Sequence, residues 1–94
     1  MRKYEITYIL RPELGDEAIA ELVEKYSQQV TEQGGTVVNV INAGKRTFAY
    51  EISGTTEGYY VTMRFDAESA VAEELRRVLT LSDDAIRSLV ITVD

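Results

Sequence analysis

Two pairs of neighbouring cations are the side chains of this chain best suited to binding chemistry. Arg2 and Lys3 stand near the start, and Lys45 and Arg46 follow Gly44 in the stretch GKRTFAYE. Guanidinium and ammonium groups hold phosphate oxygens, and in physiological salt they act over about 8 Å. We predict that these four cations contact the phosphates of a nucleic acid as one patch built from two segments. The simpler interpretation is a set of charges that keeps a sheet edge from aggregating.

The remaining polar residues argue against an enzyme. The chain has no His and no Cys, which removes the usual general base, thiolate nucleophiles and disulfides. The acid pairs Glu73-Glu74 and Asp83-Asp84 are adjacent in sequence, so on a helix or turn they diverge. The stretch RPELGDE at 11–17 is acidic and lacks the glycines of a phosphate-cradling loop, as an acylphosphatase-like hydrolase would need. We expect no catalytic residue, no metal site, no cofactor and no small-molecule substrate.

The overall charge restricts how a nucleic acid could bind. Sixteen acids against ten bases give a net charge of −6, so no diffuse positive field attracts RNA, and any contact must be local. No run of about 18 apolar residues is present, and the charged start does not resemble a signal peptide. We therefore predict a cytoplasmic protein without a membrane partner.

Hydrophobic periodicity predicts six elements. Period-two alternation marks strands and helical spacing marks helices. A break near Asn42 and Gly44 predicts a bulge or bend inside the second strand, and Asp66 or Ser69 is a candidate cap of the second helix. The predicted elements are a strand at 3–10, a helix at 16–33, a strand at 36–52, a turn at 53–58, a strand at 59–65, a helix at 67–80 and a strand at 85–93.

This order predicts an α+β fold of the ferredoxin-like β-α-β-β-α-β type. Its length suits one domain spanning 1–94. Right-handed crossovers place both helices on one face of a four-stranded antiparallel sheet, and the other face is left open.

Apolar residues are expected on both faces of that sheet. If Tyr4, Ile6, Tyr8 and Leu10 face the helices, Ile9 faces outward. The last strand adds Leu89 and Ile91 to the outer side, and Tyr50 and Tyr60 are candidate surface aromatics. We predict that Ile9, Tyr50, Tyr60, Leu89 and Ile91 bind a protein partner. Self-association, or a scatter of tolerated surface apolar groups, would leave the same pattern.

A base-stacking sheet of the RNA-recognition type is not supported. That fold shares this order of elements and carries a K/R-G-F/Y-G/A-F-V-x-F/Y strand. In EGYYVTMR only Gly58 and Tyr59 fit, so Tyr59, Val61 and Met63 are better explained as one buried face.

Four stretches, in order, resemble bacterial small-subunit (30S) ribosomal protein S-six (S6). They are MRKYEITYILRPEL, GKRTFAYEI, EGYYVTMRF and LTLSDDAIRSLVITVD, and together they span nearly the whole chain. The resemblance implies a ferredoxin-like, non-enzymatic protein of the ribosome. It also implies a heterodimer with ribosomal protein S-eighteen that docks on the central domain of small-subunit ribosomal RNA, in the platform.

On this resemblance, the open sheet would meet S-eighteen, and Arg2, Lys3, Lys45 and Arg46 would meet ribosomal RNA. Thr47 stands where relatives usually carry a further basic or polar residue, which implies a thinner RNA contact. The alternatives on the same fold are an engineered or self-associating scaffold and a small-molecule regulatory module, neither of which would bind RNA.

Overall fold

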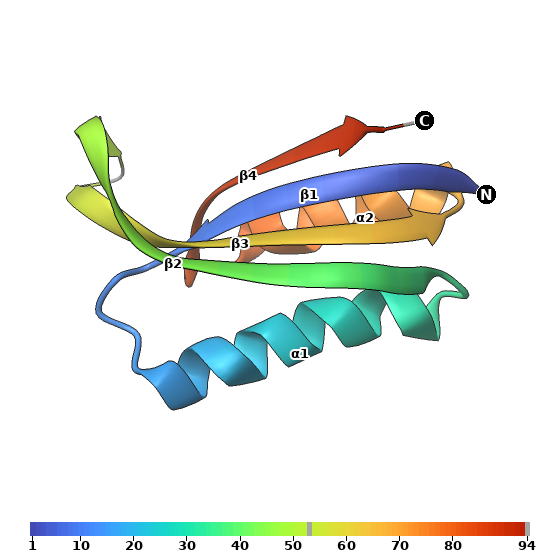
Figure 1. The fold of residues 1–94 in the computed structure, drawn as a ribbon, viewed down its shortest axis with the longest axis horizontal. Coiled ribbons are helices and arrows are strands. Elements are labelled where there is room, and N and C mark those ends of the chain that lie inside the picture. Colours follow the sequence, from blue (N-terminus) through green and yellow to red (C-terminus); the bar gives the residue numbers. More distant parts are fainter. Residues whose placement is uncertain (53, 94) are drawn as a thin grey trace.

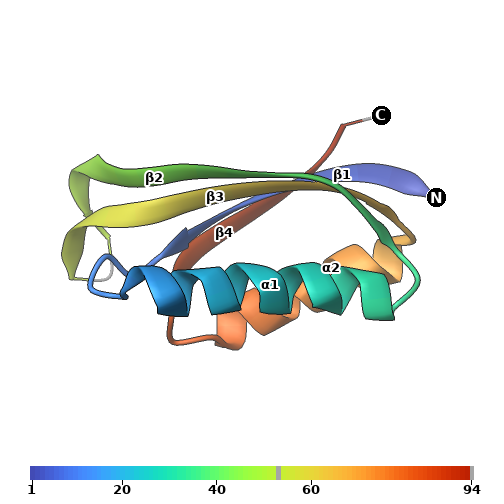
Figure 2. The ribbon, with the colours of Figure 1, turned by 60° about the horizontal axis from the view of Figure 1, so that its bottom comes forward.

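The computed structural model describes residues 1–52 and 54–93, which form one sheet and two helices. Both helices pack under the same face of the sheet, and its other face is uncovered (Figure 1 and Figure 2). The strands lie in the order β2-β3-β1-β4, and each neighbouring pair is antiparallel. The elements are β1 (Arg2–Leu10), α1 (Asp16–Glu32), β2 (Thr36–Ile52), β3 (Thr55–Ala67), α2 (Ser69–Leu81) and β4 (Ala85–Thr92). The predicted ferredoxin-like fold is confirmed.

The hairpin between β2 and β3 is longer than the sequence predicted. Ile52 pairs with Thr55, so the residues from Thr55 to Gly58 belong to β3. Gly54 has a φ of 80°, a left-handed conformation that glycine adopts without steric cost. The predicted turn at 53–58 was too long because turn-type residues, Thr55 and Gly58 among them, continue the strand pairing here.

The helix ends show one prediction confirmed and one corrected. As predicted, Gly34 and Gly35 end α1: the Gly34 amide donates to the Thr31 carbonyl at 3.2 Å and the Gly35 amide to the Val30 carbonyl at 2.9 Å. Gly34 has a φ of 88°, which completes a Schellman-type ending. The caps predicted for α2 were wrong, since Glu68 holds the N-cap position without a side-chain cap bond and Ser69 is already helical.

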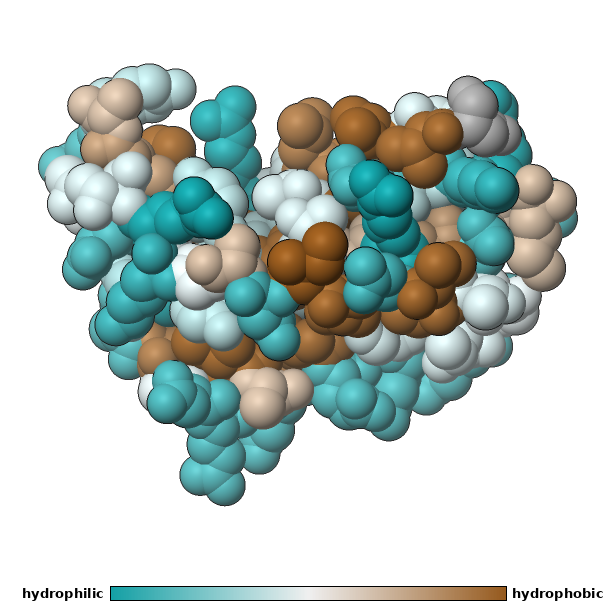
Figure 3. Space-filling model, viewed as in Figure 1, coloured by the Kyte–Doolittle hydropathy of each residue, from teal (hydrophilic) through white to brown (hydrophobic). Residues whose placement is uncertain are grey.

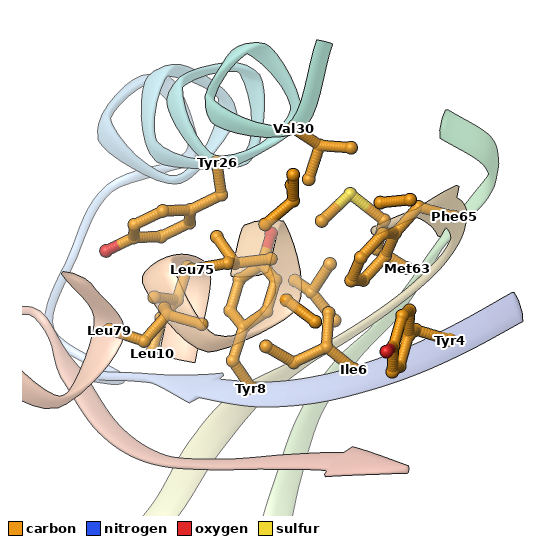
Figure 4. Close-up of a cluster of buried hydrophobic side chains, with 14 of the residues drawn as sticks. Tyr4, Ile6, Tyr8, Leu10, Tyr26, Val30, Met63, Phe65, Leu75 and Leu79 are labelled. Atoms are coloured by element: carbon orange, nitrogen blue, oxygen red, sulfur yellow. The ribbon is translucent and has the colours of Figure 1, made fainter. Parts of the chain in front are cut away.

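The core lies between the sheet and the helices, and Figure 4 shows side chains from β1, β3, α1 and α2 converging there. Tyr8 and Tyr26 meet edge to face with centroids 5.1 Å apart, and the ring of Tyr4 stacks on Phe65 at 5.5 Å. Such aromatic pairs add about 0.5–1.5 kcal/mol beyond the area that they bury. The residues predicted to face the helices from β1 are all buried, as are Val61, Met63 and Phe65 of β3.

The predicted break in β2 is confirmed. The pairing of β2 with β3 shifts register between Val37 and Asn39 and again between Asn42 and Gly44. Gly44 has a φ of 85°, which an L side chain adopts only at a cost. Such bulges bend a strand and increase its local twist. Beyond Gly44 the hairpin curls away from the plane of the sheet (Figure 1).

Candidate functional site

The open sheet face is the side of the sheet opposite the helices. Strand register places Thr7, Ile9, Tyr60 and Leu89 on it, because directly paired residues project to the same side. Leu89 is 64% exposed and Ile91 43% exposed, as the sequence predicted for this strand. Val38 and Ile41 of β2 are exposed as well. Figure 3 shows apolar surface along β4 and again across the middle of the molecule.

The burial of Ile9 differs from the prediction that this residue forms part of the exposed partner surface. It lies on the open side, yet it is only 7% exposed. A Cβ built at Gly58 would collide with Ile9 Cγ2 and lie 3.0 Å from Phe48 Cζ, so both side chains crowd over the bare glycine. Ile9 is therefore a support beneath the surface, and Phe48, which the sequence reasoning did not select, covers this part of the face.

The two tyrosines predicted for the partner surface differ in exposure. Tyr50, near the end of β2, is 68% exposed. Tyr60 is half-buried, and its ring lies 6.1 Å from that of Phe48 with the planes tilted by 60°. Of these two tyrosines, Tyr50 is therefore the one with a freely exposed ring.

The curl of the hairpin creates a hollow that we call the hairpin cleft. It has a volume of about 510 Å³ and lies between the end of the hairpin and the strands β1 and β4. Figure 3 shows the notch between the hairpin and β4. The lining residues include Ile9, Phe48, Tyr50, Tyr60, Arg87 and Leu89, so the cleft gathers most of the residues predicted to bind a partner.

Lys45 and Arg46 project to opposite sides of the sheet. Arg46 pairs with Gly58, which lies on the open face, whereas Lys45 pairs with Tyr59, which packs against the core on the helix side. Both side chains are exposed. The bulge lies before this pair, so Lys45 and Arg46 keep the ordinary alternation of a strand. The two cations therefore do not share one side of the sheet.

The four predicted cations also do not form one patch. Arg2 and Lys3 pair with Ala67 and Asp66 at one end of β3, whereas Lys45 and Arg46 pair eight residues away along that strand. At about 3.3 Å per residue the two pairs are separated by about 26 Å, roughly three times the Debye length at physiological salt. Each pair would have to contact phosphate independently.

Charge is nevertheless divided between the two sides of the molecule. Register places four cations and two acids on the open face: Lys3, Arg46, Arg64 and Arg87, with Glu5 and Asp66. Arg64 Nε donates to Glu5 Oε1 at 3.1 Å, and no hydrogen bond or ion pair is found for the described side chains of Arg46 and Arg87. Helix α1 carries five acids and one lysine. A polyanion would therefore approach the sheet and not α1.

The remaining clusters offer no reactive group. On α2, Arg77 Nε donates to Glu74 Oε2 at 3.0 Å, and this bond lowers the pKa of the Glu74 carboxyl. Among residues 1–52 and 54–93, no three His, Cys, Asp or Glu side chains are placed to hold a metal ion. Neither helix is long and apolar enough to cross a membrane.

These features define a small α+β protein of the ferredoxin-like class, whose open sheet face carries an apolar cleft and exposed cations. Comparison with known proteins agrees: the family model described as Ribosomal protein S6 matches residues 3–92. The chain belongs to the ribosomal protein S6 family, structural and non-enzymatic proteins of the small ribosomal subunit.

Relatives and solved structures are similar over nearly the whole chain. Small ribosomal subunit protein bS6 of Exiguobacterium sibiricum is 49% identical over 94 residues, covering 100% of this chain and 98% of the relative. That of Moorella thermoacetica is also 49% identical, covering 96% of this chain and 92% of the relative. The crystal structure of 30S ribosomal protein S6 from Thermotoga maritima is 29% identical, with a TM-score of 0.93, covering 98% of this chain and 87% of that one.

A more distant likeness shows the fold alone. The C-terminal domain of the MgtC protein from Mycobacterium tuberculosis is 14% identical, with a TM-score of 0.69, and the match covers 99% of this chain and 88% of that one.

Proposed function

We propose that this protein binds the central domain of small-subunit ribosomal RNA, in the platform, as one half of a heterodimer with ribosomal protein S-eighteen. The observation that carries the proposal is the open sheet face, where exposed apolar side chains stand beside Arg46 and Arg87, for which no acidic partner is found among the described residues. Membership of the S6 family supports a place on the small subunit, in the cytoplasm. The protein acts by docking and not by catalysis.

The partner covers the apolar part of the open face. Leu89, Ile91 and Tyr50 would lose their exposed surface to it, with Tyr60 and the buried Ile9 supporting them from beneath. Burying apolar surface gives about 25 cal/mol per Å², and exposed aliphatic residues on one face are the usual mark of a protein interface. This accounts for a sheet face that is unusually apolar for one in water.

The cations act as two separate RNA contacts. Arg46 and Lys45 at the hairpin, and Arg2 and Lys3 at the start of β1, each reach phosphates of different nucleotides. The net charge of −6 opposes RNA binding by the protein alone, so affinity depends on the cations of the partner. Each phosphate contact should steepen the plot of log affinity against log salt concentration by about 0.9 on a duplex, and by a little less on single strands.

The test is a titration of a central-domain RNA fragment with this protein, with and without S-eighteen. The double variant Lys45→Ala/Arg46→Ala should weaken RNA binding of the heterodimer about tenfold or more and reduce the salt slope by about 1–2. The variant Arg76→Ala on α2, in the layer beneath the sheet, is the matched control and should bind as the unchanged protein does. Equal RNA affinity for the double variant and the control would overturn the assignment of these cations.

The same samples also test whether S-eighteen is the partner. A heterodimer in sedimentation of the mixture supports the proposal. A homodimer of this protein that excludes S-eighteen would instead support a self-associating scaffold, since the same apolar face would then be covered by a second copy.

A further inference from the structure

We propose that the hairpin cleft receives one anchoring residue of the protein partner, a bulky apolar side chain whose neighbouring carboxylate pairs with Arg87. This inference rests on the proposed function and specifies how the partner is held. The starting observation is that an apolar cleft of the open face and the guanidinium of Arg87, which has no partner among the described residues, occupy the same place.

The shape of the cleft suits an anchor. Its volume of about 510 Å³ lies in the range of about 300–1,000 Å³ that is usual for pockets that bury a ligand, and it has room for one or two large side chains. Ile9 and Phe48 are already packed together over Gly58, so this wall of the cleft is formed before binding. A preformed pocket for a single bulky side chain is typical of the residues that dominate binding energy in protein interfaces.

The wall opposite the hairpin comes from β4. Leu89 pairs with Thr7 and Arg87 pairs with Ile9, so the two side chains stand next to each other on the open face. Leu89 is 64% exposed and loses water on contact with an anchor. Beside it on the open face the hydroxyls of Thr7 and Thr62 bond to each other at 3.1 Å, so these polar groups satisfy one another.

The positive charge of Arg87 favours a carboxylate next to the anchoring side chain of the partner. Arg87 is the only charged residue among the lining residues that the structure describes, and Arg46 projects from the same face two residues before Phe48. The nearest acid of the open face by register is Glu5, which is already bonded to Arg64. An exposed guanidinium beside an apolar pocket pairs best with a carboxylate, in a bidentate and charge-assisted hydrogen bond.

A protein segment fits this cleft better than a nucleotide does. Seven of the eleven described lining residues are aliphatic or aromatic, namely Ile9, Phe48, Ala49, Tyr50, Ile52, Tyr60 and Leu89. A single lining cation gives little attraction for a sugar-phosphate chain in a protein of net charge −6. The apolar surface also continues from Leu89 along β4 to Ile91 and Val93, which extends a protein interface.

Three small probes separate the possible occupants in a nuclear magnetic resonance titration of the full chain labelled with ¹⁵N. N-acetyl-tryptophan carries an apolar ring beside a carboxylate, N-acetyl-tryptophanamide carries the ring without the charge, and uridine monophosphate represents a nucleotide. We expect N-acetyl-tryptophan to shift the amide signals of Phe48, Tyr60 and Leu89, and to bind about three- to tenfold tighter than the neutral amide.

Matched variants locate the two parts of the site. Arg87→Gln should remove the preference for the acid over the amide, whereas Arg76→Gln on α2 should keep it. Leu89→Ala should weaken both tryptophan probes, whereas Leu81→Ala on α2, which is about as exposed as Leu89 and lies outside the cleft lining, should leave them unchanged. Since these side chains are exposed, all four variants should fold, and their spectra report it directly.

Three results would overturn the inference: equal binding of the acid and the amide, tighter binding of uridine monophosphate than of N-acetyl-tryptophan, or shifts confined to signals outside the cleft. The titration contains no S-eighteen, so its outcome is independent of the proposed heterodimer. A chain that binds S-eighteen but shows any of these three results would retain the proposed function and lose the anchor site.

Discussion

Ile9 packs against the backbone of Gly58 so closely that position 58 has no space for a side chain. A Cβ there would overlap Ile9 Cγ2 and press on Phe48 Cζ at 3.0 Å. We predict that Gly58→Ala lowers the free energy of unfolding by about 1–3 kcal/mol, because an overfilled site forces its neighbours off their preferred rotamers. Urea unfolding of the purified variant measures this loss.

The same overlap provides its own control. Leu has no Cγ2 branch at Cβ, so Ile9→Leu removes the colliding atom while keeping the side-chain volume. Gly58→Ala should therefore cost less than half as much in the Ile9→Leu background as in the unchanged protein. Equal costs in the two backgrounds would show that this contact does not explain the glycine.

A second prediction concerns the bend of β2. Gly44 has a φ of 85°, and its missing Cβ has open space, so the constraint is the backbone and not packing. Gly44→Ala should lower the free energy of unfolding by about 1–2 kcal/mol. Gly44→Asn should cost clearly less, because Asn tolerates this conformation better. Unfolding curves of the two variants that coincide would contradict this explanation.

A third prediction separates partner binding from stability on β4. Leu89→Ser should weaken the binding of S-eighteen about tenfold, because an exposed apolar group would then no longer be buried in the complex. Leu81→Ser on α2 is the matched control, since Leu81 is 68% exposed and Leu89 64%. Both variants should unfold within about 0.5 kcal/mol of the unchanged protein. Calorimetric titration with S-eighteen measures the affinity of each variant. Equal affinity for the two variants would show that Leu89 does not lie in the interface.

A fourth prediction concerns alkaline pH. Burial raises the pKa of Tyr8 far above its usual value near 10, and the neighbouring Tyr26 raises it further. In the unfolded chain the phenol ionises near pH 10, so above this pH the unfolded state binds fewer protons than the folded one. The contribution of Tyr8 is complete below pH 10 and is lost as the pH rises, at up to about 1.4 kcal/mol per pH unit.

The variant Tyr8→Phe isolates that contribution. It has no phenol at position 8, so its free energy of unfolding should fall less steeply between pH 10 and 11.5 than that of the unchanged protein. Tyr26, whose pKa burial also raises, remains in both proteins and cancels in the comparison. Parallel stability curves for the two proteins would contradict the assignment to Tyr8.

The alternation of polar and apolar residues was sufficient to predict the layers of the fold. In β1 and β3 the period of two identified the buried face, including Val61 and Met63, while Tyr59 packs against the core and is only partly buried. It could not predict the burial of Ile9, because that depends on a glycine 49 positions away and on a bend that brings Phe48 over both. Contacts across strands of this separation leave no periodic signal in the sequence.

The separation of the two cation pairs, in contrast, could have been predicted from the strand topology. Strands β1 and β2 both run antiparallel to β3 and hence parallel to each other, so Arg2 at the start of β1 lies level with the start of β2. Lys45 is nine residues beyond Thr36, the first residue of β2. Two separate clusters follow from this order alone, and the prediction of one patch overlooked it.

The broken register of β2 has a further consequence for the free protein. This strand borders the sheet, and its outer edge carries backbone groups that could recruit another copy. Shifts of register after Val37, Asn42 and Thr47 interrupt the regular hydrogen-bond spacing that a growing fibril requires. The free protein, whose apolar sheet face is uncovered, is thereby less able to polymerise edge to edge.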